Sequence, residues 1–385
     1  MEQKRTLEQQ LYTIAFMGLA VKNILDSSLL FKRPEWVDTM LLLLFFGVII
    51  AKLGMQSYTK KQILSFTFFG LICIYTCFKM KYFYLIFSFL GIIAVQNVNL
   101  KDVMKYTSYT KTVMILIHVI GYILATLTHS SKVYLVVRNG VARHFFFLGH
   151  PNTFSMYVLW ASLEYLYAKY DEIKTPKIMF VYGINLLTYY FTNSNTGLMV
   201  STLVVFFILL DKMGKKKIVS IIGPMSKYSF AIFSVFFPGL CVMYTRLSGT
   251  MLEFYNSLNE FFTGRLLYGA YVYDVYGLSI LGKVIKFPEK SHWRGHWLDT
   301  MVFDNAYIWL FVMYGSVYLV ILSVAFILIA KKTTTQEKIF IVGLALYGIM
   351  EAYVINASSA FPLLFIGKYI YDQRKNNKKL CSNGW

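Results

Sequence analysis

Charged residues are scarce in this sequence. Only 15% of its 385 residues are Asp, Glu, Lys or Arg, whereas a soluble domain averages about 25%. Hydrophobic residues make up 57%, compared with roughly 45 to 50% in soluble domains. A soluble core cannot absorb so many apolar stretches of about 17 to 25 residues, the length at which a helix crosses the hydrocarbon layer. The composition excludes an ordinary soluble domain and predicts one all-α, polytopic integral membrane domain over residues 1–385.

Cysteine is also scarce, and nucleotide-binding motifs are missing. Four cysteines are too few for a disulfide framework, and three of them lie within or at the end of apolar segments. The chain has no G-x-x-x-x-G-K-[ST] phosphate loop, no dinucleotide-binding glycine fingerprint and no pair of aspartates two apart. We therefore expect no cofactor, no ATP-driven reaction and no metal-held nucleotide sugar.

Acidic residues are outnumbered by basic ones. The chain has 38 Lys and Arg against 19 Asp and Glu, a net charge of +19. Such a charge can indicate nucleic-acid binding, but here the basic residues form short clusters between apolar spans rather than one amphipathic face. We expect no nucleic-acid partner and interpret the clusters as topology signals.

Apolar stretches between polar breaks predict about twelve transmembrane helices. They lie near residues 11–31, 36–53, 62–78, 82–100, 112–130, 153–169, 177–193, 196–211, 228–246, 306–330, 338–356 and 358–371. Between them lie an outer loop at 131–152 and a long extracellular loop at 247–304, and a basic tail follows at 372–385.

The distribution of Lys and Arg predicts that both chain ends are cytoplasmic. With the amino terminus inside, 24 Lys and Arg residues fall on inner segments and 13 on outer ones, six of them in the long loop. Long loops are weak indicators for the positive-inside rule, so the bias among short loops is stronger still. The tail 372–385 then lies at the inner surface, where its basic residues face anionic lipid.

The loop at 131–152 is the first candidate for function. It contains Arg138, Arg143 and His150, and arginine presents a planar fork of donors that suits phosphate oxygens. The Gly-His-Pro-Asn turn before the sixth span predicts a helix start capped by Asn152 or Thr153, and such a helix start favours an anion. The alternative is an ordinary outer loop with arginines that snorkel to the membrane surface.

The long loop at 247–304 is the second candidate, because loops of this length in compact proteins are usually functional or disordered. It carries Arg265, Arg294 and His296, and ends in Asp304-Asn305. Counted with Arg246 at its edge, its six basic and six acidic residues predict a folded loop with internal pairs. Its tryptophans can stack on sugars or form an interfacial aromatic belt, and both interpretations stay open.

Two further residue types in these segments bear on chemistry. His292 and His296 are four apart with Glu289 before them, but Gly295 argues against a ligand-bearing helix, so we predict no metal site. A general base for a hydroxyl could be His150, His296, Asp299 or Asp304 by side-chain type. The glutamates within spans, Glu164 and Glu351, are expected to brace neighbouring helices.

The run from Arg143 to Phe154, RHFFFLGHPNTF, resembles the signature before a helix in Wzy-type polymerases of capsules and exopolysaccharides, within the O-antigen polymerase and ligase superfamily. Thr263-Gly264-Arg265-Leu266 and the stretch from Phe303 to Tyr307, followed by Tyr314-Gly315, agree in order and placement. Arg138 to Gly149 fits the family's R-x10-G pattern, whereas Arg265 to Gly277 departs from it by one residue. Related ligases carry His before the Asn that opens the next span, and here Asp304 stands in that place.

The resemblance implies a metal-independent glycosyltransferase of a bacterial cytoplasmic membrane. It would polymerise oligosaccharide repeat units carried as donor and acceptor on undecaprenyl pyrophosphate at the outer leaflet, surrounded by membrane lipid. A chain-length regulator and a flippase of the same pathway would be its partners. The implied catalytic residues are Arg143, Arg265, His150, His296 and Asp304, and the implied substrate-binding residues are Arg138, Asn152, Arg294 and Asn305. The alternatives are a lipid-linked oligosaccharide flippase, a ligase that differs in its acceptor, and a non-enzymatic scaffold.

Overall fold

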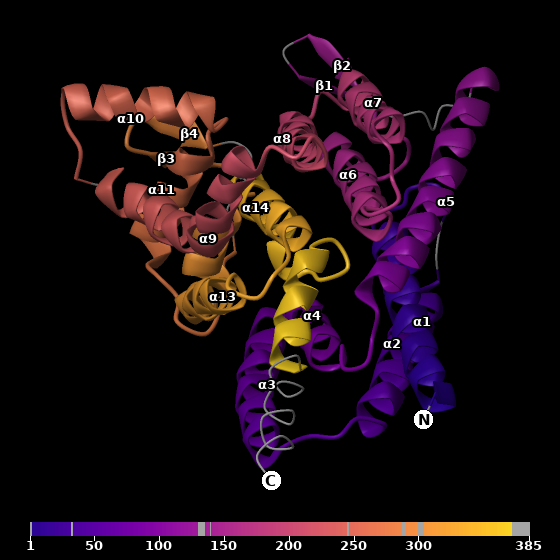
Figure 1. The fold of residues 1–385 in the computed structure, drawn as a ribbon. Helices are drawn as coiled ribbons and strands as arrows, with labels where there is room; N and C mark the ends of the chain where they lie inside the picture. The colour runs from indigo at the N-terminus through magenta and orange to yellow at the C-terminus, as the bar shows by residue number, and fades with distance from the viewer. Residues whose placement is uncertain are drawn as a thin grey trace.

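The computed structural model describes residues 2–31, 34–129, 135–138, 140–244, 246–286, 290–298 and 304–371. In these residues the chain forms 14 α-helices and two small β-hairpins, which confirms the all-α class (Figure 1). The tail 372–385, expected to be cytoplasmic, lies outside the described residues.

The helices follow one another with short connections. The first five are α1 (Glu2–Asp26), α2 (Glu35–Gly54), α3 (Lys60–Met80), α4 (Tyr84–Ile93) and α5 (Leu100–Leu127), and the hairpin β1 (Val136–Arg138) and β2 (Val141–Arg143) follows. The middle of the chain holds α6 (Pro151–Ala168), α7 (Thr175–Thr192), α8 (Asn195–Lys212) and α9 (Lys216–Tyr244). The long loop contains α10 (Thr250–Phe261), α11 (Arg265–Tyr276), β3 (Ser291–Trp293) and β4 (His296–Leu298). The chain continues through α12 (Ala306–Trp309), the π-helix η1 (Leu310–Gly315), α13 (Ser316–Ile329), α14 (Thr335–Met350), the 3-10 helix η2 (Ala352–Ile355) and a last helix, Phe361–Tyr371.

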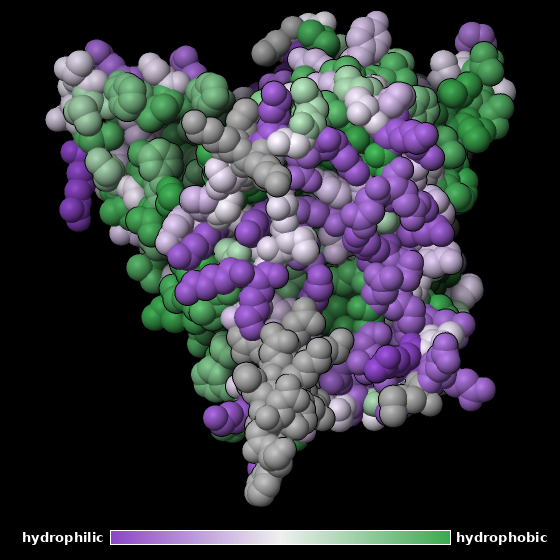
Figure 2. All heavy atoms as spheres, in the orientation of Figure 1, coloured by the Kyte–Doolittle hydropathy of each residue, from purple (hydrophilic) through white to green (hydrophobic). Residues whose placement is uncertain are grey.

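Six helices of the described residues are long and apolar enough to cross a membrane. They are α2, α3, α5, α8, the Ser220–Tyr244 part of α9, and the continuous run Ala306–Ile329. At most 28% of the most apolar stretch of α2, α3 or α5 is buried, so their apolar side chains face outward as in a bilayer. Hydrophobic residues accordingly cover the flanks of the face in Figure 2, while hydrophilic residues gather right of its centre. By the length and composition of these helices the chain is a membrane protein. The number of twelve transmembrane helices stays a prediction.

One expected span is shorter than the sequence predicts. The apolar stretch 82–100 contains only α4, with 10 residues. At 1.5 Å per residue this helix is about 15 Å long, half of the roughly 30 Å hydrocarbon layer. Residues from Ala94 to Asn99 instead form a turn that leads into α5, which Asn99 caps by accepting a hydrogen bond from Lys101 N.

The expected spans 338–356 and 358–371 are also interrupted. Helix α14 ends at Met350, and the residues from 351 to 360 contain no α-helix although nearly all are buried. Irregular backbone at membrane depth is tolerated only where protein or water satisfies its polar groups. Here Ser88 Oγ donates to Ile355 O and accepts from Ala357 N, and the Lys111 ammonium donates to Ser358 O. We call residues 351–360 the irregular segment.

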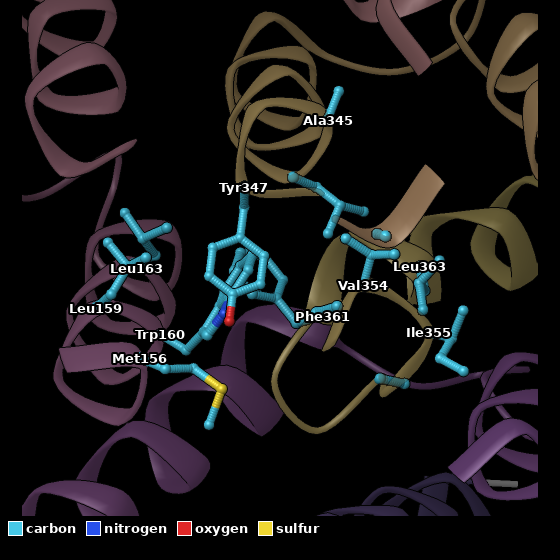
Figure 3. Close-up of a cluster of buried hydrophobic side chains, with 14 of the residues drawn as sticks. Met156, Leu159, Trp160, Leu163, Ala345, Tyr347, Val354, Ile355, Phe361 and Leu363 are labelled. Atoms are coloured by element: carbon cyan, nitrogen blue, oxygen red, sulfur yellow. The ribbon is translucent and has the colours of Figure 1, made fainter. Parts of the chain in front are cut away.

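One part of the hydrophobic core lies between α6, α14 and the irregular segment (Figure 3). Trp160 of α6 packs edge to face against Tyr347 of α14, with ring centroids 5.2 Å apart, and against Phe361, at 6.0 Å. All three side chains are almost fully buried. These large rings fix the position of the end of α14, where a site residue lies.

The π-helix η1 is joined to the long loop by backbone hydrogen bonds. Ser279 N donates to Phe311 O, Lys283 N donates to Met313 O, and Ser316 N donates back to Ser279 O. A π-helix leaves some of its backbone carbonyls without the usual donor within the helix. Here backbone N–H groups of the long loop act as donors to two such carbonyls. Gly315 adopts φ +125°, and a Cβ there would lie 2.2 Å from Ile280 O, so only glycine allows this approach.

The two candidate loops lie at the same end of the molecule. In Figure 1 the hairpin β1–β2, α10 and the hairpin β3–β4 lie toward the top, whereas α1 begins and the last helix ends toward the bottom. This arrangement agrees with an amino terminus opposite the two loops. Which end faces the cytoplasm stays a prediction.

Candidate functional site

The first loop folds as a hairpin followed by a helix cap. Arg138 pairs with Val141 and Val136 with Arg143 across β1 and β2. The cap of α6 is His150, whose Nδ1 accepts from Asn152 N at 3.2 Å, and Pro151 occupies the first helical position. The expectation that Asn152 or Thr153 caps this helix is therefore wrong, because the imidazole nitrogen takes the place of the usual hydroxyl or amide oxygen.

Arg143 is buried at the end of this hairpin, with 4% of its surface exposed. Its Nε donates to Thr192 O at 2.7 Å, which is the last carbonyl of α7, and one terminal nitrogen donates to Asn152 Oδ1 at 2.8 Å. The last carbonyls of a helix have no partner within it and carry the negative end of its dipole, so a guanidinium fits there. A buried, anchored side chain is not a snorkelling one, and the ordinary-loop alternative does not describe Arg143.

Arg265 has an equivalent position in the long loop. It begins α11 and is 6% exposed, and its Nε donates to Met350 O at 3.2 Å, the last carbonyl of α14. One terminal nitrogen donates to Thr263 Oγ1, and the other lies 3.4 Å from Asp304 Oδ2. Both buried arginines of these loops therefore cap a helix through Nε and direct their terminal nitrogens to the surrounding polar groups.

A narrow polar pocket lies close to the residues that hold the two arginines, and neither arginine forms part of its wall. Its walls come from the start of α6, the turn between α7 and α8, and the end of α14; they are Asn152, Ser155, Met156, Leu159, Ser194, Thr196, Gly197, Tyr347 and Glu351. Asn152 holds Arg143 on one side, and Glu351 directly follows Met350, whose carbonyl holds Arg265, on the other. The first loop thus contacts a wall residue of the pocket, and the second contacts the residue before another wall residue.

The charges around the pocket modify one another. Partial burial raises the pKa of Asp304, and the nearby Arg265 opposes that rise. Desolvation lowers the pKa of His150, and the positive charges of Arg143 and Arg138 lower it further, so the imidazole is neutral at neutral pH. The part of the site near His150 therefore carries the positive charges of Arg138 and Arg143, which suit an anion.

The other residues predicted for the site lie elsewhere or serve the fold. Asn305 is buried, accepts from Ile308 N at 3.0 Å as the cap of α12, and donates to Ile349 O at 2.7 Å. Arg138 is exposed on β1. Asp299 lies outside the described residues.

The β3–β4 hairpin carries His296 and Arg294 away from the pocket residues. His296 Nε2 lies 3.4 Å from Tyr244 OH, and the Arg294 guanidinium lies 5.4 Å from the centre of the Trp293 ring. Trp293 also donates from Nε1 to Asp274 Oδ2 at 2.9 Å. This internal pair agrees with a folded loop, and the exposed Trp297 ring remains available for a sugar or for the interface.

No protein family model, curated protein or solved structure matches this chain. Among the residues that the structure describes, no group of three or more His, Cys, Asp or Glu side chains could hold a metal ion. The geometry of the pocket is therefore the basis for any functional assignment.

Sequence reasoning missed Glu351 as a site residue. It was expected to brace helices, as Glu164 does by pairing with Lys111, but it lines the pocket instead. One signal was present: the stretch YGIMEAYVI holds a lone glutamate without a basic residue within one helical turn. Intramembrane carboxylates without a local partner are functional candidates by default.

Proposed function

We propose that this chain is a membrane polysaccharide polymerase. It joins oligosaccharide repeat units carried on undecaprenyl pyrophosphate at the outer face of a bacterial cytoplasmic membrane, for capsule or exopolysaccharide synthesis. The observation that supports this function best is the pair of buried arginines, Arg143 and Arg265, which come from two different loops and hold residues at or next to one polar pocket.

In this reaction the arginines bind the pyrophosphate of the donor. Each guanidinium is fixed through Nε, so its terminal nitrogens are already oriented and lose little entropy when an anion binds. Positive charge in a site shielded from water also stabilises the charge that develops on the leaving pyrophosphate. The donor carries its own leaving group, so the reaction needs no nucleotide.

An apolar groove that includes part of the irregular segment supports a lipid-linked substrate. It has a volume of about 470 Å³ and lies between α3, α4, α13 and the last helix. Ile355 forms part of its wall, only four residues from Glu351 in the pocket. The irregular segment therefore has one side at a polar pocket and the other at an apolar groove, as a pyrophosphate with a polyprenyl chain requires.

The position of the arginines favours glycosyl transfer over lipid flipping. A flippase needs cationic groups in a central cavity that opens alternately to both sides. Here the buried arginines belong to the loops at one end of the molecule. A ligase would perform the same chemistry on a different acceptor. A chain-length regulator and a flippase of the same pathway would be the partners of a polymerase.

Removal of either arginine tests the function. We expect Arg143→Ala and Arg265→Ala to reduce polymer synthesis by about 10²-fold or more, because each removes a fixed donor for the leaving group. Single repeat units on the lipid carrier should accumulate in a strain that contains only the variant. The measurement is surface polymer length on a gel, with extraction of the lipid-linked glycan.

Two controls separate chemistry from folding. Arg143→Lys and Arg265→Lys keep the charge but lose the planar fork, and should be inserted normally with reduced polymer. Arg246→Ala removes an exposed arginine at the edge of the same long loop and should have no effect. Full-length polymer from both alanine variants, at normal amounts in the membrane, would show that the assigned function is wrong.

A further inference from the structure

Four glutamates of the described residues are buried, and one differs from the other three. Glu8 pairs with Lys52, Glu164 with Lys111, and Glu337 with Lys368. Glu351, which is 5% exposed, forms no ion pair among the described residues. A buried carboxylate without a cation is costly, so such a group is kept where it has a chemical task.

The surroundings of Glu351 contain groups of both charges. Its carboxylate accepts one long hydrogen bond, from Thr196 Oγ1 at 3.4 Å. Asp304 and Arg265 act on it with opposite signs, and Asp304 lies within the ion pair that Arg265 forms. Glu351 is therefore the least satisfied carboxylate of the site.

The backbone at Glu351 directs this side chain into the pocket. Helix α14 ends at Met350, and Glu351 has an extended conformation, with φ −143° and ψ 139°. A continuing helix would have placed the next residues along the α14 axis, whereas the break turns the chain toward the irregular segment. The Trp160 and Tyr347 rings hold this point of the chain rigidly (Figure 3).

We infer that Glu351 is the general base that accepts the proton of the sugar hydroxyl that attacks the donor. This inference rests on the proposed function and extends it to a residue that the sequence patterns had assigned to helix packing. In the step, the acceptor oxygen forms a bond to the anomeric carbon of the donor sugar. The bond from that carbon to the pyrophosphate oxygen breaks, and its electron pair leaves with the lipid pyrophosphate. The hydroxyl proton moves to a Glu351 oxygen.

The other base candidates are occupied by different contacts. The His150 Nδ1 accepts from the α6 backbone, and the His296 ring lies against Tyr244. Asp304 is held by Arg265 in an ion pair. None of these three side chains lines the pocket, whereas Glu351 does.

Several charged and titratable groups face this carboxylate and enter any pH profile. They are Arg265 from the start of α11, Asp304 before α12, Tyr347 on α14 and Tyr353 on η2. Arg143 and His150 lie beyond Asn152 on the α6 side. Arg143 and Arg265 stay charged and the tyrosines stay neutral near pH 7. Glu351, Asp304 and His150 are the groups that can change protonation there.

The test uses the purified full-length protein and the lipid fraction extracted from a strain that lacks it. That fraction holds the accumulated natural substrate, so polymer formation can be followed at about pH 5 to pH 9. We expect Glu351→Gln to reduce the rate by about 10²-fold to 10⁴-fold, with substrate retention by the immobilised protein within about threefold of the unchanged chain. The rate of the unchanged chain should rise with pH through one ionisation that the Gln variant lacks.

Two more variants serve as a control and as a conservative change. Glu337→Gln neutralises another buried glutamate outside the pocket and should retain the pH profile. Glu351→Asp keeps a carboxylate but shortens it, and should retain ionisation with a rate reduced by about tenfold or more. A Glu351→Gln rate above a third of the normal value, or an unchanged pH profile, would overturn the assignment and leave the polymerase function intact. If the unchanged chain makes no polymer from this fraction, the proposed function itself fails, and the role of Glu351 fails with it.

Discussion

At the scale of single residues, the two buried arginines combine contacts to a helix end with contacts to nearby polar side chains. Arg143 caps α7 and Arg265 caps α14, each through Nε. Lysine has one ammonium and cannot bind a helix end and an anion in two fixed directions at once. This explains why the two loops place arginine, rather than lysine, at the ends of α7 and α14.

His150 makes the folded protein sensitive to mild acid. The pKa of this imidazole lies below its usual value of 6.5, because of desolvation and the charges of Arg143 and Arg138. Between the two pKa values the unfolded chain binds more protons than the folded one, so stability falls as pH decreases below 6.5. A protonated Nδ1 also cannot accept the hydrogen bond from Asn152 N.

Thermal unfolding of the detergent-solubilised protein at several pH values measures this effect. The contribution of His150 is fully present above pH 6.5 and is lost as pH falls toward the folded-state pKa. Because the side chain is partly exposed, solvent screening keeps the change below about 1 kcal/mol. His150→Asn should retain a cap and reduce the loss of stability in acid. An equal loss in the variant would contradict the role of His150.

At the scale of elements, hydropathy predicts the continuous helices and misses the broken ones. Helices α2, α3 and α5 are recognisable because each is a long apolar stretch that faces outward. The break after Met350 is not recognisable, because the segment remains apolar on both sides of it. The backbone can leave the helix there because the side chains of Ser88 and Lys111 donate hydrogen bonds to its carbonyls. Both side chains lie more than 240 residues away in sequence from those carbonyls.

In the candidate site, too, the sequence predicts local contacts and misses contacts between remote segments. Arg143 and Asn152 were found because they lie nine residues apart around a turn with a distinctive sequence. Glu351 was missed because α6, α8 and the long loop create its environment, and these segments are remote in the chain. The contact of the long loop with η1 was missed for the same reason.

Gly315→Ala tests the contact between the long loop and the π-helix. The added Cβ would meet Ile280 O at 2.2 Å, and φ +125° is strained for any L side chain. We expect a loss of about 2 to 4 kcal/mol in stability and faster proteolysis of the long loop. Gly183→Ala is the matched control, since nothing lies within 4 Å of its added methyl, and helix propensity makes it neutral or slightly stabilising. Equal protease resistance in the two variants would argue against the contact.

At the scale of the whole molecule, the first half of the chain holds the last part in place. Lys111 on α5 contacts Glu164 on α6 and the carbonyl of Ser358 in the irregular segment. One buried ammonium therefore joins three parts of the sequence. Its charge is compensated by Glu164, so the pair can stay in an apolar core.

Removal of this ammonium should destabilise the whole protein. Lys111→Met leaves the Glu164 carboxylate buried without its cation, at a cost of about 3 to 5 kcal/mol. The double variant Lys111→Met/Glu164→Leu removes both charges and should recover about half of that loss. Yield of inserted protein and thermal unfolding in detergent measure both effects. A double variant less stable than the single one would show that the pair is not the main contact.

The irregular segment has a consequence for synthesis. Its residues leave the ribosome after Ser88, Lys111 and Trp160, which lie in earlier helices. The segment satisfies its backbone against those residues, and Glu351 lies at its start. The pocket can therefore be completed only after the earlier helices are in place, and a chain terminated before residue 351 would enter the membrane without a complete site.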